Sequence, residues 1–358
     1  MNEKDVFIIQ PYLKVNKIYK ETDLYEAKKL IEAINLNPSL LKLVGLDKIN
    51  SKTFINSGLV IELKNEVIYK KIDLIFINSN LSPIQQRNLE KEIRCKVIDR
   101  TGLILEIFGA RAQSNEGKLQ VQLASLQYQK SRLVRSWTHL ERQRGGAGFM
   151  GGPGESQIES DRRQITEQIN RIKLKIKKIN KTRDLQRYRR KKNNIPIISL
   201  VGYTNSGKST LFNNLTNSDV LAKDMLFASL DSTIRKLKIN KRNFILVDTV
   251  GFIKSLPTSL IAAFKATLDE IINSDLILHI RDISNSENQS QKNDVLKVLK
   301  ELGIDEQDPR ILDVINKIDL IDASDEINVI SKNIVSISAL NGLGINKIKK
   351  KMYDLISH

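Results

Sequence analysis

Short apolar runs alternate with amphipathic stretches over residues 1–110, a pattern typical of an α/β domain rather than an all-helical one. Three of these runs predict strands: residues 6–9, 74–77 and 96–98. Residues 24–34 place apolar side chains on one face at helical spacing, so they predict a helix. Ser82 followed by Pro83 predicts the start of another helix, because the hydroxyl can cap the first turn and proline is favoured there.

Two long helices are predicted between residues 117 and 192, because apolar positions step by four and three in each half of this stretch. The first stripe consists of Leu119, Leu123, Leu126, Leu133, Trp137 and Leu140, with Lys130 interrupting it. The second consists of Ile158, Ile165, Ile169, Ile172, Ile176 and Ile179, with one position missing near Arg162. Two heptad stripes joined by a short loop predict an antiparallel coiled-coil hairpin, weak at those two levels.

The loop between these helices, residues 144–154, is rich in glycine. Basic residues flank it: Arg142, Arg144, Arg162 and Arg163. One interpretation is a flexible turn without contacts. The other is a tip whose bare backbone approaches RNA closely, with Phe149 or Met150 available to stack on bases.

The apolar run 195–201 predicts a buried strand, and the eight residues after it fit the phosphate-loop pattern GxxxxGK[ST]. These residues are Gly202, Tyr203, Thr204, Asn205, Ser206, Gly207, Lys208 and Ser209. The glycines let successive N–H groups curl around phosphate oxygens at the positive end of the following helix. Lys208 would reach the β- and γ-phosphates, and the Ser209 hydroxyl would bind Mg²⁺. Taken alone, these eight residues leave open a glycine-rich turn that binds nothing.

A second motif follows the apolar strand that begins at residue 244 and ends in DxxG. Asp248 would hold Mg²⁺ through water, and the Gly251 N–H would sense the γ-phosphate, with Thr249 and Val250 between them. Lys208, Asp248 and Gly251 are therefore the predicted catalytic residues.

The strand 311–319 ends in NKxD, formed by Asn316, Lys317, Ile318 and Asp319. Asp319 would accept hydrogen bonds from guanine N1 and N2 and Asn316 would meet the other edge of the base, whereas adenine would leave the carboxylate unpaired. A last strand, residues 334–340, places Ser338, Ala339 and Leu340 beside guanine O6. Four motifs in this order, each at a strand end, predict a GTPase domain that binds GTP, GDP and Mg²⁺.

The chain of 358 residues has a formal net charge of +17, which favours a polyanionic partner. The excess is clustered: residues 171–192 contain twelve Lys or Arg and a single acid, Asp184. A solvated helix face in a Lys-rich composition is the alternative to a phosphate-binding surface. With one cysteine, Cys95, and three histidines, neither a disulfide framework nor a structural zinc site is expected. The absence of a signal-like start or a membrane-length apolar run predicts a cytoplasmic protein without stable membrane insertion. A monomer is expected.

Three stretches resemble a known family. They are DRTGLILEIF at 99–108, GPGE at 152–155 with DRR at 161–163, and DTVGFIKSLP at 248–257. They are similar to HflX, the ribosome-associated bacterial GTPase. The resemblance implies an N-terminal α/β domain with a helical hairpin, a Ras-like GTPase domain, and binding to the large ribosomal subunit and its rRNA. It also implies splitting or anti-association of ribosomes, especially under stress.

The expected domains are an N-terminal α/β domain at 1–112, a helical hairpin with a glycine-rich tip at 113–194, and the GTPase domain at 195–358. An expected nucleotide-contacting switch segment consists of Phe227, Ala228, Ser229, Leu230 and Asp231. Within it, Ser229 stands where the family usually has a threonine that binds Mg²⁺, and Thr233 is a nearby substitute.

Two other departures bear on activity. Phe252 follows DxxG in place of the glutamine that orients water in other small GTPases, so hydrolysis in isolation is expected to be slow. The chain ends at His358, and the extra C-terminal domain of longer relatives is expected to be absent. Rival functions are an RNA-remodelling protein with ATP-dependent activity in its N-terminal half, and a GTPase peripheral to a membrane surface.

Overall fold

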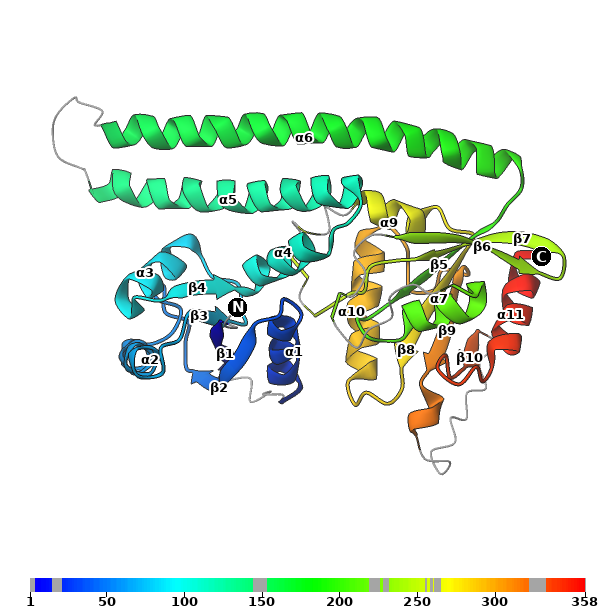
Figure 1. The fold of residues 1–358 in the computed structure, drawn as a ribbon, viewed down its shortest axis with the longest axis horizontal. Coiled ribbons are helices and arrows are strands. Elements are labelled where there is room, and N and C mark those ends of the chain that lie inside the picture. The colour runs from blue at the N-terminus through cyan, green and yellow to red at the C-terminus, as the bar shows by residue number, and fades with distance from the viewer. Residues whose placement is uncertain are drawn as a thin grey trace. The chain divides into compact units, whose positions relative to one another are not determined.

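The computed structural model describes residues 4–14, 21–143, 153–218, 226–227, 232–254, 256–257, 260, 265–321 and 333–357. The chain divides into two compact units (Figure 1). The first consists of Met1–Ala110 with Lys118–Ile176, and the second of Arg111–Gly117 with Lys177–His358. The predicted α/β fold class is confirmed, and the predicted boundaries at 112 and 194 stay predictions.

The first unit contains a four-stranded parallel sheet with the order β2-β1-β3-β4. Its strands are β1 (Asp5–Leu13), β2 (Asn37–Leu46), β3 (Leu74–Ile77) and β4 (Lys96–Asp99). The helices α1 (Glu21–Glu32), α2 (Ser57–Lys70), α3 (Pro83–Ile93) and α4 (Arg100–Arg111) follow the strands in turn. The three strands predicted from apolar runs are present, and β1 is longer than predicted. β2 was not predicted, because it is an edge strand on which exposed and half-buried positions alternate.

The predicted start of α3 is confirmed. The Ser82 hydroxyl accepts from the Gln85 N–H at 3.2 Å, and the Gln85 side chain accepts from the Ser82 N–H at 2.9 Å. This reciprocal pair is a capping box, with Pro83 in the first turn. The apolar face of α3 then packs Leu89 and Ile93 into the core of the sheet.

A buried carboxylate lies where β4 ends and α4 begins. Asp99 is 1% exposed, and its Oδ1 accepts from the Gly102 N–H at 2.8 Å and the Tyr128 hydroxyl at 2.5 Å. Its Oδ2 accepts from the Leu81 N–H at 3.2 Å and from Arg132 at 2.8 Å. Both carboxylate oxygens are therefore fully used inside the first unit, in what we call the Asp99 cluster. Burial, with the Asp99 charge, raises the pKa of Tyr128 above its ordinary value, so the phenol stays a donor.

Two long helices, α5 (Asn115–Gln143) and α6 (Pro153–Lys192), follow the N-terminal sheet (Figure 1). Their shared seam buries Leu123 and Leu126 against Ile169 and Ile172. Leu119, Ile165 and Ile176 flank this seam, as the heptad spacing predicts. The tip at 144–152 lies outside the described residues, as do the side chains of Trp137, Leu140 and Ile158.

The second unit contains a six-stranded sheet with the order β10-β9-β8-β5-β7-β6. All neighbours are parallel except β6 and β7. The strands are β5 (Ile197–Gly202), β6 (Thr233–Ile239), β7 (Arg242–Asp248), β8 (Leu276–Asp282), β9 (Ile311–Asn316) and β10 (Ile334–Ser336). The helices are α7 (Lys208–Thr216), α9 (Lys265–Ile272), α10 (Asn288–Glu301) and α11 (Ile345–Ser357), with a short 3₁₀ turn, η2, at Ile318–Leu320.

The two faces of this sheet differ in polarity. One face packs Leu200, Leu278 and Val314 against α7 and α11. The opposite face places the His279 side chain 3.8 Å from Asp313, which also pairs with Arg281 at 3.0 Å. Burial lowers the pKa of His279 to about 4, so the imidazole is neutral at physiological pH.

An ion-pair cluster joins the base of the two long helices to α9 within the second unit. Glu270 of α9 is completely buried and accepts from Arg187 at 3.2 Å, with Arg183 4.0 Å away. Arg183 also pairs with Glu116 at 2.8 Å. We call these four residues the Glu270 clasp. Two arginines of the basic run 171–192, Arg183 and Arg187, therefore have acidic partners inside the protein, so not every member of the run is available to phosphate.

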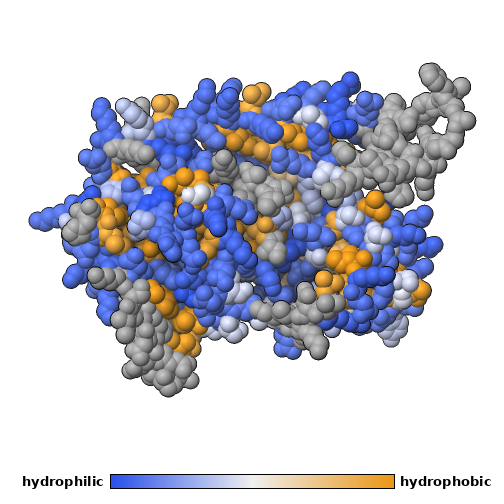
Figure 2. Space-filling view, turned by 180° about the vertical axis from the view of Figure 1, so that it is seen from behind, coloured by the Kyte–Doolittle hydropathy of each residue, from blue (hydrophilic) through white to orange (hydrophobic). Residues whose placement is uncertain are grey.

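Exposed apolar side chains are dispersed. Figure 2 shows one face of the molecule, on which hydrophilic residues predominate and hydrophobic residues form small groups. Tyr69, Tyr188 and Leu340 are each at least 70% exposed and belong to different elements. In the part of the chain that the structure describes, no helix combines the length and the apolar content needed to cross a bilayer.

Candidate functional site

The predicted nucleotide motifs lie at one edge of the second sheet. The carboxyl ends of the parallel strands β5, β7, β9 and β10 lead into the phosphate loop, DxxG, NKxD and the Ser338 segment. Because carboxyl ends of parallel strands share an edge, motifs far apart in sequence meet there. The sequence analysis placed each of these motifs at a strand end, and the sheet topology brings the strand ends to one edge.

The phosphate loop requires glycine at the start of α7. Gly207 has φ 91°, and an added Cβ would lie 2.2 Å from the Asn316 side-chain nitrogen. Both the conformation and the space therefore exclude a side chain. The loop presents its N–H groups at the N-terminus of α7, where phosphate is favoured.

Lys208 is buried beneath the loop. Its Nζ donates to the carbonyl oxygens of Gly202 at 3.2 Å and Tyr203 at 2.7 Å. Burial lowers the pKa of Lys208 to about 8, and the nearby Asp248 partly opposes that shift. The ammonium group is thus costly to keep charged without an anion beside it, as a phosphate-binding lysine would be.

Ser209 and Asp248 form an oxygen-rich pair. The Ser209 hydroxyl donates to Asp248 Oδ2 at 2.7 Å, and Asp248 Oδ1 is buried without a hydrogen-bond partner among the described residues. Burial raises the pKa of Asp248, while Lys208 and the Ser209 hydrogen bond act in the opposite direction. A hydroxyl and an unsatisfied carboxylate oxygen fit Mg²⁺, which prefers oxygen ligands.

Part of the predicted switch segment cannot be compared. Ala228, Ser229, Leu230 and Asp231 lie outside the described residues, whereas Phe227 is described and buried. Thr233, the substitute for Ser229, begins β6 and lies opposite Asp248 in the β6–β7 register.

The DxxG segment is bonded directly to the phosphate loop. The Phe252 N–H donates to the Gly202 carbonyl at 3.0 Å, and the Thr204 N–H donates to the Phe252 carbonyl at 2.7 Å. Gly251 precedes Phe252, and an added Cβ on Gly251 would lie 2.9 Å from the Thr204 methyl and 3.1 Å from Lys208 Nζ. Gly251 therefore has no room for a side chain.

Thr249 and Val250 are both buried. The Thr249 hydroxyl donates to the Leu200 carbonyl at 2.5 Å. That hydroxyl is therefore occupied by the strand beside it, and the N–H groups of this segment are what it can offer a nucleotide.

At the predicted guanine-binding segment, Asn316 forms hydrogen bonds to both the phosphate loop and the Ser338 segment. Its Nδ2 donates to the Ser206 carbonyl at 2.9 Å, and its Oδ1 accepts from the Ala339 N–H at 2.9 Å. Lys317 pairs with Asp282 at 2.7 Å, and η2 includes Ile318 and Asp319.

Asp319 differs from these neighbours. Its Oδ1 is buried and has no hydrogen-bond partner within the described residues, so it is available for a base. The Ser338 hydroxyl accepts from the Asn341 N–H at 3.1 Å, while the Leu340 side chain is exposed.

Three contacts at this edge were missed from sequence. The Tyr203 hydroxyl accepts from the Lys254 N–H at 2.7 Å, Asn214 of α7 donates to the Ala339 carbonyl, and Asp282 holds Lys317. Each joins segments far apart in the chain, and none follows a recognisable spacing.

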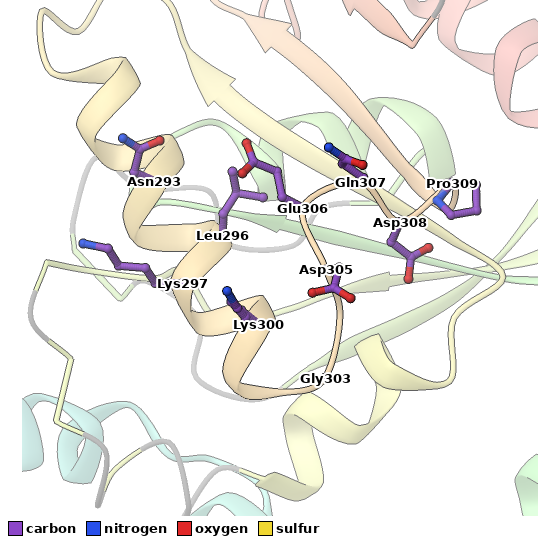
Figure 3. A pocket seen from close by; sticks show the side chains of 10 residues that line it. All are labelled: Asn293, Leu296, Lys297, Lys300, Gly303, Asp305, Glu306, Gln307, Asp308 and Pro309. Atoms are coloured by element: carbon purple, nitrogen blue, oxygen red, sulfur yellow. The ribbon is translucent and has the colours of Figure 1, made fainter.

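A hollow of about 870 Å³ lies near the end of α10 and the loop before β9, away from the carboxyl edge (Figure 3). Its lining includes both basic and acidic residues: Lys297, Lys300, Asp305, Glu306 and Asp308 (Figure 3). Asp308 is already held by Arg310 at 2.7 Å, which lowers the pKa of the carboxyl. The mixed charges give this hollow no preference for a nucleotide.

Comparison with known proteins identifies the family. Three family models match: "GTP-binding GTPase N-terminal" at 21–109, "GTP-binding GTPase Middle Region" at 111–190 and "50S ribosome-binding GTPase" at 197–317. GTPase HflX of Magnetococcus marinus is 48% identical over 332 residues, covering 92% of this chain and 76% of the relative. The chain belongs to the HflX family. GTPase HflX of Escherichia coli is 42% identical, covering 94% of this chain and 79% of the relative.

The HflX family fold also occurs among solved structures. A GTP-binding protein from Sulfolobus solfataricus, solved in complex with GDP, is 26% identical with a TM-score of 0.51, and the match covers 99% of both chains. The predicted family and fold are thereby confirmed. This HflX-family protein is a GTPase that binds guanine nucleotide, from a ribosome-associated family.

Proposed function

We propose that this HflX-family GTPase binds the large ribosomal subunit through its rRNA and separates ribosomes or prevents their association, under stress. The observation that carries the proposal is the match of residues 197–317 to a family described as a 50S ribosome-binding GTPase. The net charge of +17 supports a nucleic-acid partner. We propose that the protein is a cytoplasmic monomer with three domains: the α/β domain at 1–112, the helical hairpin at 113–194 and the GTPase domain at 195–358.

In the proposed nucleotide site, the phosphate-loop N–H groups bind the phosphates and Lys208 neutralises their charge. Ser209 and Ser229 would hold Mg²⁺, and Asp248 would assist from beside Ser209. The ion supplies charge neutralisation and a fixed arrangement of phosphate oxygens when bound. Asp319 selects guanine, since its Oδ1 is buried without a protein partner among the described residues.

Phe252 after DxxG cannot polarise water, so the proposed enzyme hydrolyses GTP slowly alone and faster on the large subunit. Rapid turnover that large subunits leave unchanged would contradict this part of the proposal.

The proposed RNA-binding surface is the exposed face of α6. Its exposed basic side chains are Arg171, Lys173, Lys175, Lys177, Lys178 and Lys181. Arg183 and Arg187 are excluded because their side chains are only 22% and 14% exposed and pair with acids in the Glu270 clasp. The hairpin tip, whose structure is not described, is proposed to act on rRNA during splitting.

The proposal is tested by sedimenting the purified protein with large subunits, small subunits or anionic liposomes, with GTP or ATP analogues. Co-sedimentation with large subunits that requires the GTP analogue is expected. Binding to liposomes instead, or dependence on the ATP analogue, would favour one of the rival functions.

Two variants distinguish binding of the large subunit from splitting of ribosomes. Charge reversal of Lys173 and Lys177 should weaken subunit binding and flatten its salt dependence, because phosphate contacts are lost. Charge reversal of Lys297 and Lys300 on α10 is the matched control.

Replacing residues 145–152 by a two-residue turn should abolish ribosome splitting in a sucrose gradient while GTP binding is kept. Normal splitting by that variant would show that the tip only connects the two helices and has no role in splitting.

A further inference from the structure

Phe252 leaves the hydrolytic step without a polar side chain at the position after DxxG. Its ring is buried, at 2% exposure. Its N–H and carbonyl are both engaged by the phosphate loop, through Gly202 and Thr204. For hydrolysis by the protein alone, the group that positions the attacking water is therefore expected to be another residue close to Gly251.

Thr204 is such a residue. It is only 7% exposed, and its Oγ1 is buried without a hydrogen-bond partner among the residues that the structure describes. A buried hydroxyl without a hydrogen-bond partner destabilises the folded protein. The unpartnered hydroxyl of Thr204 therefore indicates contact with a ligand.

The position of Thr204 is fixed on two sides. Its N–H donates to the Phe252 carbonyl at 2.7 Å, so the DxxG segment and the third loop residue are bonded together. Its methyl and Cα lie 2.9 and 3.0 Å from the point where a Gly251 Cβ would be, with Lys208 Nζ 3.1 Å from the same point. Thr204 therefore lies beside Gly251 and Lys208, the two residues proposed to face the γ-phosphate. Its branched side chain also has few rotamers.

We propose that Thr204 is a catalytic residue for GTP hydrolysis, whose hydroxyl accepts a hydrogen bond from the attacking water and donates one to a γ-phosphate oxygen. A hydroxyl can donate and accept at once, which the buried Phe252 ring cannot do. The inference rests on the proposed nucleotide site.

The step itself is ordinary hydrolysis. The water oxygen forms a bond to the γ-phosphorus, and the bond from that phosphorus to the β–γ bridging oxygen breaks. The electron pair of the broken bond leaves with GDP, and the proton of the water passes to the phosphate product. Thr204 is unchanged at the end, and it acts by orientation.

Thr204→Val and Thr204→Ser test this role in the full-length protein. Valine has the shape of threonine without the hydroxyl, and serine keeps the hydroxyl. Single-turnover GTP hydrolysis should fall about 10-fold or more in Thr204→Val, as when one transition-state hydrogen bond is removed. Thr204→Ser should stay within about 3-fold of the parent, because its hydroxyl can make the same contacts.

A second readout excludes a merely structural role. Fluorescent GTP and GDP should bind Thr204→Val within about 3-fold of the parent, whereas GDP with aluminium fluoride, a transition-state mimic, should bind at least about 10-fold more weakly. A parental hydrolysis rate in Thr204→Val, or equal losses for GDP, GTP and the mimic, would overturn the proposal. If Thr204→Val fails to fold by thermal melting, Thr204→Ala carries the same expectations.

Lys208→Ala separates the failure of this inference from the failure of the site beneath it. That variant should lose both GTP and GDP affinity. Unchanged nucleotide binding in Lys208→Ala would contradict the proposed site itself, whatever Thr204→Val does.

Discussion

The carboxyl edges of the two sheets differ in how many of their buried oxygens have hydrogen-bond partners in the protein. At the carboxyl edge of the first sheet, both oxygens of Asp99 accept two hydrogen bonds each from the protein. At the same edge of the second sheet, four buried oxygens have no partner among the described residues. They belong to Thr204, Ser206, Asp248 and Asp319. At these two edges, the satisfied oxygens of Asp99 indicate a structural role, and the unsatisfied oxygens of the second sheet are candidates for contact with a ligand.

The largest effect is expected from breaking the satisfied edge. Asp99→Ala would leave Arg132 without its buried carboxylate, so the free energy of unfolding should fall by about 3 to 5 kcal/mol. Urea unfolding followed by circular dichroism measures this change. Asp47→Ala, which removes the exposed partner of Lys14, should cost at most about 1 kcal/mol. Equal costs for both variants would mean that the Asp99 cluster contributes little to stability.

Asp319→Asn changes the unsatisfied edge and should give the converse result. GTP affinity should fall about 100-fold and xanthosine triphosphate should bind better, because the amide donates where xanthine presents O2. The free energy of unfolding should change by less than about 0.5 kcal/mol, since Asp319 Oδ1 has no protein partner in the described chain. Isothermal titration with both nucleotides measures the switch. Tight GTP binding with rejection of the xanthine nucleotide would show that the base contact is misassigned.

Alkaline pH tests the buried charge beneath the phosphate loop. The pKa of Lys208 is lowered to about 8, so the ammonium loses its proton as the pH rises through that value. Phosphate binding needs the charged form, and GTP affinity should therefore fall about 10-fold between pH 7 and pH 9. Lys208→Arg, which keeps its charge, should show a smaller fall in the same titration. An equal fall in both proteins would assign the effect to another group.

The smallest effect tests a local signal in the first unit. Ser82→Ala removes the hydroxyl that caps α3, and the free energy of unfolding should fall by about 1 kcal/mol. Thermal melting detects it, with Ser82→Thr as the control that keeps a capping hydroxyl. A loss in Ser82→Thr equal to that in Ser82→Ala would contradict the capping role.

Sequence predicted best the features that depend on neighbours along the chain. The strands at 74–77 and 96–98, the cap at Ser82 and the order of the nucleotide motifs all follow from local spacing. β2 was missed because an edge strand needs no continuous apolar run.

Contacts between distant segments could not be predicted in this way. The basic run 171–192 does not reveal which of its members face an acid of their own protein, as Arg187 faces Glu270. The phosphate loop was found, but the contact of Thr204 with Gly251 depends on how two strand ends meet.

The Glu270 clasp has a mechanical consequence. Arg183 and Arg187 lie near the end of α6, a helix of 40 residues that is about 60 Å long at 1.5 Å per residue. Glu270 lies on α9, which follows the DxxG segment in the chain. A tilt of about 5° at the clasp would move the far end of a straight 60 Å helix by about 5 Å, from its length alone. The length of α6 therefore converts a small change in its direction at the clasp into a larger displacement at its other end.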